Sequence, residues 1–218
     1  MKAVVIFSGG QDSTTCLGWA KNRYDEVVAM SFFYGQKHAV ELRQGEIIAE
    51  KLGVERHVIQ ADFFGSMVDS ALTHNGDVNV PHGRLKHLPA SYVPNRNGFF
   101  LLLAHAFAQK IGAGVLVAGM CQTDYSGYPD CRRDVLDDGI KFLNGGSDSD
   151  IRLETPLMYL TKAETFALAE AEGVLPLVIE ESHTCYNGDR SKRHAWGYGC
   201  GECPACQIRA KGWAEFKA

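Results

Sequence analysis

The sequence has no apolar run that approaches the roughly 18 residues of a membrane-spanning helix. The N-terminal stretch MKAVVIFSGG leads directly into a strand pattern and carries no small-residue cleavage site of a secretory signal peptide. A long basic stripe is also missing, and the formal net charge of −4 does not favour generic binding to nucleic acids. These absences predict a cytoplasmic protein that has neither a membrane nor a nucleic acid among its partners.

Cysteines in a disulfide-like pattern are lacking too. Of the 7 cysteines, Cys16, Cys121 and Cys131 are isolated, and the others crowd the C-terminal end at positions 185, 200, 203 and 206. An odd total with clustered spacing indicates metal ligands in a reducing compartment rather than disulfide bonds. A chain of 218 residues with 45% hydrophobic residues is long enough to bury a stable core without such bonds.

Strand-like and helix-like stretches alternate along most of the chain. This alternation predicts an α/β fold, in which right-handed βαβ units build a parallel sheet of about five strands with helices on both faces. The expected strands are residues 1–7, 26–33, 54–60, 114–118 and 151–155, and the expected helices are residues 12–22, 36–52, 97–111, 132–143 and 161–172.

Several segments interrupt or bound this pattern. Residues 61–94 show little periodicity and predict a functional or mobile loop. The turn residues NGGSDSD, at 144–150, are expected to end the preceding helix, and TKAE, at 161–164, has the pattern of a capping box. Beyond Ser182 the composition shifts to glycine, cysteine and polar residues. We therefore expect a main domain over residues 1–182 and a C-terminal segment, 183–218, packed on it.

The stretch SGGQDS, residues 8–13, lies where the first expected strand becomes a helix. A glycine-rich turn at a helix N-terminus directs backbone N–H groups and a partial positive charge at one point, which is a cradle for phosphate. The stretch contains no lysine and matches neither the Walker A loop nor the G-x-G-x-x-G pattern. The alternative is a tight turn in which a serine or an aspartate serves as the helix N-cap.

The C-terminal cysteines, Cys185 and the Cys-x-x-Cys-x-x-Cys run at 200–206, provide four thiolates. Such a set suits tetrahedral Zn²⁺, and because all four positions are filled by protein, the predicted zinc is structural rather than catalytic. An iron–sulfur cluster and unligated cysteines in a packed tail are the alternatives. His183 and His194 lie nearby as reserve ligands, although a purely structural role suits both better.

Several motifs together carry a family resemblance. The loop SGGQDS resembles the pyrophosphate loop of the N-type ATP pyrophosphatases, which split ATP between its α- and β-phosphates. FFYGQKHAVE, YVPNRNGFFL, TDYSGYPDCR, ETPLMYLTKAET and TCYNG followed by GCGECPACQIRA narrow this match, in order and spacing, over nearly the whole chain. The sequence resembles the QueC family, the 7-cyano-7-deazaguanine synthases of queuosine biosynthesis. The resemblance implies a Rossmann-like fold of the adenine nucleotide alpha hydrolase type, with ATP and Mg²⁺ in use, and a homodimer.

The same resemblance implies a ligase that forms C–N bonds on one substrate carbon. ATP would activate the carboxylate of 7-carboxy-7-deazaguanine as an acyl adenylate, and ammonia would displace AMP to give the amide. A second ATP would activate the amide oxygen, and loss of AMP would leave the nitrile. Composition and spacing do not show this substrate.

The resemblance also places the nucleotide site. The glycine-rich loop would grip the phosphates and residues 33–38 would touch the adenosine, so that the expected ATP-binding residues are Ser8, Gly9, Gly10, Gln11, Asp12, Ser13, Thr14, Tyr34 and Gln36. Asp12 is the expected Mg²⁺ partner, because Mg²⁺ prefers oxygen ligands. With Lys162 and Arg96 it completes the expected catalytic set. For Lys162 a solvated surface position is an equal alternative, and His38 as a catalytic base is weighed against a structural role.

A flat, polar, anionic heterocycle needs hydrogen-bond partners, an aromatic face and a cation. The expected substrate contacts are Arg96, Asn97, Asp124, Tyr128, Asp130 and Arg132, with Tyr125 as a second stacking ring. Most of them follow the strand that ends near Ala118, and open α/β sheets bind ligands at such strand ends. A surface ion pair for Arg96, core positions for the tyrosines and turn positions for the aspartates are the alternatives.

Two other functions fit parts of the sequence. Cys121 and Cys131 are compatible with a tRNA-thiolating relative that carries a persulfide, although no RNA-binding appendage is visible. The second alternative is a zinc-containing module that binds ATP only as a switch. Such a module would give Arg96 and Asp124 no role. An AMP-forming enzyme is distinguished from such a module because it releases AMP only when its acceptor is present.

Overall fold

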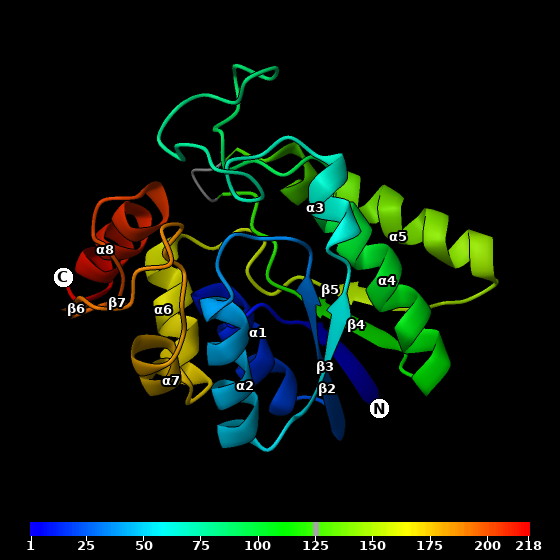
Figure 1. Cartoon of the computed structure of the whole chain (residues 1–218). Helices are drawn as coiled ribbons and strands as arrows, with labels where there is room; N and C mark the ends of the chain where they lie inside the picture. Colours follow the sequence, from blue (N-terminus) through cyan, green and yellow to red (C-terminus); the bar gives the residue numbers. More distant parts are fainter. Residues whose placement is uncertain (124–126) are drawn as a thin grey trace.

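The computed structural model describes residues 1–123 and 127–218, which are arranged around one parallel sheet (Figure 1). The strand order is β3-β2-β1-β4-β5, and every pair of neighbouring strands is parallel. The strands are β1 (Lys2–Ile6), β2 (Glu26–Phe33), β3 (Glu55–Gln60), β4 (Val115–Ala118) and β5 (Arg152–Glu154). The order switches sides between β1 and β4, so their C-terminal ends form the crevice where α/β sheets bind ligands.

Helices cover both faces of the sheet, which explains why the central strands are apolar on both sides. On one face lie α1 (Gln11–Lys21) and α2 (Val40–Leu52), and on the other lie α4 (Arg96–Ile111) and α5 (Arg133–Ser147) (Figure 1). Successive β1 side chains enter opposite cores: Val4 and Ile6 pack with α4, whereas Val5 packs with α1 and α2. The predicted sheet and its two helical layers are confirmed.

The C-terminal part of the chain packs beside α1 rather than on the sheet (Figure 1). It contains α6 (Lys162–Ala171), α7 (Leu175–Glu180), a small hairpin of β6 (Arg193–His194) and β7 (Gly197–Tyr198), and α8 (Pro204–Phe216). Phe166 of α6 and Trp213 of α8 meet edge to face, with ring centroids 5.1 Å apart. The division of the chain at residue 182 stays a prediction.

The structure corrects the prediction that NGGSDSD ends its helix. Helix α5 continues through both glycines to Ser147, and the chain turns at Asp148, which has a φ of 49°. The physical reason is tertiary: the Asn144 side chain accepts from His105 Nε2 and donates to the carbonyl of Ile151, at 3.0 and 2.9 Å. These contacts outweigh the weak helix propensity of glycine.

Other differences concern short elements. Residues 61–94 contain a short helix, α3 (Phe63–Met67), where no element was predicted. Helices α7 and α8 and the hairpin were not predicted either, because this part of the sequence lacks a clear apolar period. The capping box is confirmed: the Thr161 side chain accepts from the Glu164 N–H, and the Glu164 carboxylate accepts from the Thr161 N–H. Among the described residues no helix is both long and apolar enough to cross a membrane.

Candidate functional site

The glycine-rich loop is shaped by close packing against α2 and by the Ser13 hydroxyl. Gly9 has a φ of +92°, and a Cβ at this position would lie 2.4 Å from the carbonyl oxygen of Glu41. The Ser13 hydroxyl oxygen accepts from the N–H groups of Ser8 and Gly9, each at 3.2 Å. The N-cap of α1 is Gly10 without a side-chain cap bond, so the alternative of a serine or aspartate N-cap is wrong.

The same loop has an unused polar group. The Gln11 side chain is buried, and its amide nitrogen has no hydrogen-bond partner among the described residues. Buried polar groups are almost always hydrogen-bonded in native proteins. A phosphate oxygen would supply the missing acceptor, so the loop fits the ATP that its sequence implies.

Asp12 and Lys162 meet although they are 150 residues apart in the sequence. The Lys162 ammonium lies 3.0 and 2.9 Å from the two carboxylate oxygens of Asp12. Lys162 is the first residue of α6, and its stem packs so closely on α8 that a Cβ at Gly212 would lie 2.6 Å from it. The alternative of a solvated surface lysine is therefore wrong, and Lys162 belongs to the wall beside the loop.

A cleft of about 240 Å³ opens over the C-terminal ends of β1 and β4. Its lining joins the glycine-rich loop to residues from the end of β2, the start of α4 and the segment after β4. The predicted site residues that line it are Ser8, Gly10, Gln11, Asp12, Ser13, Tyr34, Arg96, Asn97 and Tyr128. Gly9 and Thr14 are buried neighbours of these residues in the chain, but they do not line the cleft.

Arg96 stands across the cleft from the loop, at the first position of α4. Its guanidinium donates to the Tyr34 hydroxyl at 3.4 Å and lies 5.9 Å from the centre of that ring. Burial lowers the pKa of Arg96, but the neighbouring phenols of Tyr34 and Tyr128 outweigh burial, so the net shift is upward. Arg96 is therefore a permanent cation that faces the phosphate cradle.

Asp130 and Asn97 fix the start of α4. The Asp130 carboxylate accepts from the Asn97 backbone N–H at 3.0 Å, as an acid at a helix N-terminus does. The Asn97 side chain donates to the Asp130 carbonyl at 3.4 Å, and the Tyr128 hydroxyl lies 2.8 Å from that of Ser91. Asn97 and Tyr128 line the cleft, whereas Asp130 lies behind them, with one carboxylate oxygen that has no partner among the described residues.

The remaining predicted substrate residues lie elsewhere. Arg132 is exposed at the protein surface, where its Nε lies 3.8 Å from Asp134, and it does not line the cleft. Asp124 and Tyr125 lie outside the described residues. Gln36, which was predicted to bind ATP, does not line the cleft either and instead shapes the chain after β2: its side-chain oxygen accepts from the Tyr34 N–H at 2.9 Å.

Glu41, in the first turn of α2, is a cleft residue that the sequence analysis did not single out. Burial raises the pKa of its carboxyl group from 4.5 to about 7, although the Arg96 cation opposes the shift. A carboxyl group of this kind exchanges protons near neutral pH, which suits a general acid or base. The sequence could have indicated Glu41 through its place in the motif FFYGQKHAVE, which follows a strand that ends at the rim of the cleft.

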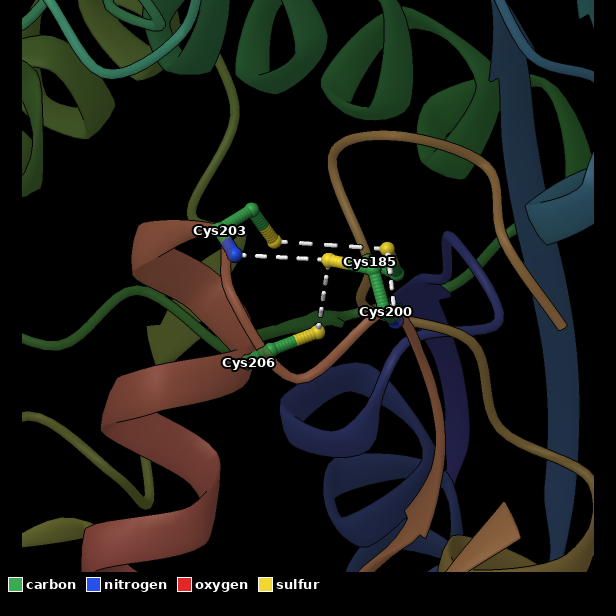
Figure 2. A group of neighbouring side chains, drawn as sticks. All are labelled: Cys185, Cys200, Cys203 and Cys206. Carbon is green, nitrogen blue, oxygen red and sulfur yellow. Dashed lines mark hydrogen bonds between the residues drawn. The ribbon is translucent and has the colours of Figure 1, made fainter. Parts of the chain in front are cut away.

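The predicted metal ligands come together in one buried group (Figure 2). The sulfur atoms of Cys185, Cys200, Cys203 and Cys206 all lie within 4.8 Å of one another. The Cys200–Cys206 and Cys185–Cys203 sulfur distances are 3.9 and 4.0 Å, far longer than the roughly 2.05 Å of a disulfide bond. Four sulfurs placed about 2.3 Å from one tetrahedral ion would be about 3.8 Å apart, so this set fits a single metal ion.

The surroundings of the cysteines favour that role. The Cys203 and Cys206 thiols donate to the Cys185 sulfur, which lowers the pKa of Cys185 and raises the pKa of the two donors. A thiolate is the form that binds metal. A Cβ at Gly199 would lie 2.6 Å from the Cys206 sulfur, so only glycine fits there. The reserve ligand His194 instead bonds the Gly199 carbonyl oxygen, at 3.0 Å, and stacks on Trp196.

The cysteine segment, residues 183–206, also supports the glycine-rich loop. The His183 N–H donates to the Gly9 carbonyl at 3.0 Å. The Thr184 hydroxyl oxygen accepts from Arg209 of α8 at 3.1 Å and from the Gln11 N–H at 3.4 Å. Burial lowers the pKa of Arg209 to about 10, so it stays charged at neutral pH. The cysteine cluster is thus tied to the floor of the cleft through one short stretch of backbone.

The other candidates from the sequence also have definite places. Cys121 and Cys131 both line the cleft, where the Cys121 thiol donates to the Leu160 carbonyl and the Cys131 sulfur accepts from Asn97. His38 lies outside this lining and borders a smaller neighbouring cavity. Its ring packs so closely on Gly188 that a Cβ there would lie 2.5 Å away.

Comparisons with known proteins identify the family of this chain. The model of the family described as "Queuosine biosynthesis protein QueC" matches residues 2–217. The chain is 54% identical to the 7-cyano-7-deazaguanine synthase of Wolinella succinogenes over 218 residues, which cover 99% of this chain and 94% of the relative. It is 50% identical to the enzyme of the same name from Helicobacter pylori strain P12, over 99% of this chain and 95% of the relative.

A solved structure resembles the fold at low sequence identity. The crystal structure of a 4-thiouridine synthetase–RNA complex with bound ATP matches with a TM-score of 0.54 and 16% identity, over 100% of this chain and 53% of that chain. At this identity the likeness concerns the fold alone.

Proposed function

The chain belongs to the QueC family of queuosine biosynthesis proteins, and from this premise we propose that it is an ATP-dependent 7-cyano-7-deazaguanine synthase. It is a C–N bond-forming ligase that converts 7-carboxy-7-deazaguanine and ammonia to the nitrile. The observation that carries the proposal is that Arg96 and the glycine-rich loop face each other across one cleft. One side suits a carboxylate and the other suits phosphates, so the cleft can hold an acid beside ATP.

The reaction explains why two such sides are needed. A carboxylate oxygen of the acid attacks the α-phosphorus of ATP, and pyrophosphate leaves. Ammonia then forms the C–N bond and AMP leaves, which gives the amide. The amide oxygen is adenylated by a second ATP, and the nitrile forms when AMP and protons are lost. In each activation the protein mainly positions the reactants and neutralises phosphate charge.

The glycine-rich loop is assigned to the phosphates. The assigned nucleotide-binding residues are Ser8, Gly9, Gly10, Gln11, Asp12, Ser13, Thr14, Tyr34 and Gln36. The buried Gln11 amide, which has no partner among the described residues, supports this assignment. Asp12 is assigned to Mg²⁺, since its carboxylate is the acid of the loop, and Lys162 neutralises phosphate charge from the same wall.

The opposite side of the cleft is assigned to the acid. Arg96 pairs with the carboxylate, Asn97 supplies a polar partner and Tyr128 supplies a ring. Asp130 is assigned to the same region through its contacts with Asn97. Asp124 and Arg132 stay assigned to the substrate on the sequence motif alone.

The cysteine cluster is assigned to a structural zinc ion. Cys185, Cys200, Cys203 and Cys206 supply four sulfurs, which leaves no ligand position for a reactant. The close spacing of the sulfurs favours one ion over a cluster of several irons, because iron and sulfide atoms would have to fit between the thiolates. When bound, the ion would hold the C-terminal segment against the glycine-rich loop.

We also propose a cytoplasmic location and a homodimer. Free thiols as metal ligands suit a reducing compartment. The homodimer is implied by the family resemblance, and light scattering of the purified protein tests it.

The dependence of AMP release on the acceptor tests the proposed function. The protein is incubated with ATP, Mg²⁺ and ammonium, either without an acceptor, with 7-carboxy-7-deazaguanine, or with 7-deazaguanine, which lacks the carboxylate. AMP is expected only with the carboxylic acid. AMP release that is equal in all three mixtures would mean that the nucleotide is used without this acceptor, and the proposal would be wrong.

A further inference from the structure

Thr184 is a cleft residue without a role in the assignments above, and it lies directly before Cys185 of the cysteine cluster. The backbone around it runs against the glycine-rich loop. The His183 N–H donates to the Gly9 carbonyl at 3.0 Å, and a Cβ at Gly10 would lie 3.4 Å from the His183 carbonyl oxygen. Thr184 is therefore fixed in the part of the cleft wall that is next to the loop.

The hydroxyl oxygen of Thr184 already accepts two hydrogen bonds. The Arg209 guanidinium donates through Nη1 at 3.1 Å, and the Gln11 backbone N–H donates at 3.4 Å. A hydroxyl oxygen has two lone pairs and one proton, so both acceptor positions are taken and only the proton is left to use. Within residues 1–123 and 127–218 no group accepts that proton. The hydroxyl can therefore act on a bound reactant only as a donor.

Arg209 is held in place beside Thr184. Its side chain is 1% exposed, and its Nη2 donates to the Val178 carbonyl at 2.6 Å. A Cβ at Gly197 would lie 2.6 Å from the same Nη2 atom, so backbone packs closely against the guanidinium. A donor fixed in this way keeps the Thr184 proton from pointing back at α8.

The surroundings of the Thr184 hydroxyl indicate the chemistry of the missing acceptor. A cationic donor on a hydroxyl oxygen polarises the O–H bond and makes the proton a stronger donor, above all toward an anion. A second donor without a partner among the described residues, the buried Gln11 side-chain nitrogen, belongs to the residue whose backbone bonds Thr184. Two such donors beside the glycine-rich loop suit an anionic oxygen, and the anion assigned to this loop is a phosphate.

We propose that Thr184 binds ATP by donating its hydroxyl proton to a phosphate oxygen, and that Arg209 is the positioning residue that orients this hydroxyl. The inference rests on the proposed function, because that function assigns the phosphates to the glycine-rich loop. It adds a contact from a distant part of the chain, since Thr184 is 173 residues from Gln11. The segment that carries the cysteine cluster thus contributes directly to the nucleotide site and does not only support the loop.

The variant Thr184→Val tests the hydroxyl, because valine has nearly the same shape but cannot donate a hydrogen bond. The affinity for ATP with Mg²⁺ is measured by isothermal titration calorimetry without the acid, so that no turnover is required. We expect the Kd to rise by about 10- to 100-fold, as for a lost hydrogen bond to a charged group. Thr184→Ser keeps the hydroxyl and should bind ATP nearly as tightly as the wild type.

Thr155→Val is the matched control. The Thr155 hydroxyl also accepts from an arginine, Arg133, at 2.9 Å, but Thr155 does not line the cleft, so ATP affinity should be unchanged. The thermal transition and the metal content of each variant show whether it is folded. Should Thr184→Val fail to fold, Thr184→Ala gives the same comparison, because the smaller side chain leaves room for a water molecule to accept from Arg209.

A double variant tests the part assigned to Arg209. Arg209→Lys keeps the charge but replaces the planar fork of donors by a single ammonium group, and it should weaken ATP binding in the otherwise wild-type chain. In the Thr184→Val background the same change should have little further effect on the Kd, because residues of one hydrogen-bond network are not additive. An equal fold-change in both backgrounds would mean that Arg209 acts on the cleft without Thr184.

Two results would overturn the role of Thr184. One is a folded Thr184→Val or Thr184→Ala variant with wild-type affinity for ATP, and the other is a Thr184→Ser variant that binds as weakly as Thr184→Val. A wild-type protein that binds no ATP would overturn this role together with the nucleotide assignment. The proposed function fails separately if ATP binds to the wild type but AMP release does not depend on the acid.

Discussion

Residues 183–185 connect the cysteine cluster to the cleft. The two regions differ in whether their polar groups already have partners. The four sulfurs are grouped within 4.8 Å and point at a common centre. Beside the cleft, the Gln11 amide nitrogen and the His183 ring nitrogens instead have no hydrogen-bond partner among the described residues. We infer that the grouped sulfurs stabilise the fold once a metal ion is bound, whereas the unpartnered groups are available to bound reactants.

The largest predicted effect follows from breaking the cluster. Cys203→Ser removes one of four sulfur ligands and should lose the proposed metal ion and thermal stability together, because a metal that binds only the folded state contributes its binding energy to folding. Elemental analysis and calorimetry of the purified variant measure both. Cys16→Ser, outside the cluster, is the control for metal content, since Cys16 is buried in the core and its own change affects stability. Wild-type metal content in Cys203→Ser would remove this residue from the site.

On the cleft side, the strongest effect is expected from the glycine-rich loop. Asp12→Asn keeps the size of the side chain but removes the charge that pairs with Lys162 and is assigned to Mg²⁺. We expect AMP formation to fall by about 100-fold or more, with an unchanged thermal transition and metal content. Wild-type turnover in Asp12→Asn would contradict the nucleotide assignment.

The next prediction concerns Glu41 and the pH dependence of the free energy of unfolding. Burial raises its pKa from 4.5 to about 7, so below the lower value the group is protonated in both the folded and the unfolded chain. As the pH rises through this window the unfolded chain loses the proton first, and the buried carboxylate increasingly destabilises the fold. Glu41→Gln should therefore be as stable as the wild type near pH 4.5 and more stable by about 1–3 kcal/mol near pH 8.

Urea unfolding at both pH values measures this difference. Glu50→Gln, an exposed change on the same helix, should show no such pH dependence. A Glu41→Gln variant that is equally stable relative to the wild type at both pH values would mean that the carboxyl group is not strained by burial.

The smallest effect is expected from the capping box of α6. Thr161→Ala removes the side-chain acceptor for the Glu164 N–H at the start of the helix that carries Lys162. The loss should be about 1 kcal/mol in the free energy of unfolding, with turnover changed much less than in Asp12→Asn. A loss of turnover comparable to that of Asp12→Asn would show that the helix start also controls the cleft.

The predictable parts of this protein are those encoded locally. The glycine-rich loop follows a buried strand directly, and three of the four clustered cysteines lie within 7 residues. Both motifs can therefore be recognised from residues that are close together in the sequence. The alternation of strands and helices likewise sets the sheet. The capping box at Thr161 was predicted for the same reason, since its two partners are three residues apart.

The parts that could not be predicted depend on distant partners. The role of Lys162 becomes visible only because α6 places it on Asp12, which is 150 residues away. Glu41 and His183 border the same cavity only because the fold brings the start of α2 next to residue 183. Helix α5 continues through two glycines because Asn144 is held by His105 and Ile151, which glycine propensity cannot indicate.

The first measurement to make is mass spectrometry of a reaction that contains the protein, 7-carboxy-7-deazaguanine, ATP, Mg²⁺ and ammonium. We predict 7-cyano-7-deazaguanine together with AMP, with the amide as a transient species. A reaction that stops at the amide would contradict the second activation. Absence of both amide and nitrile, with no AMP released, would contradict the central claim that this cleft joins an acid, ammonia and ATP.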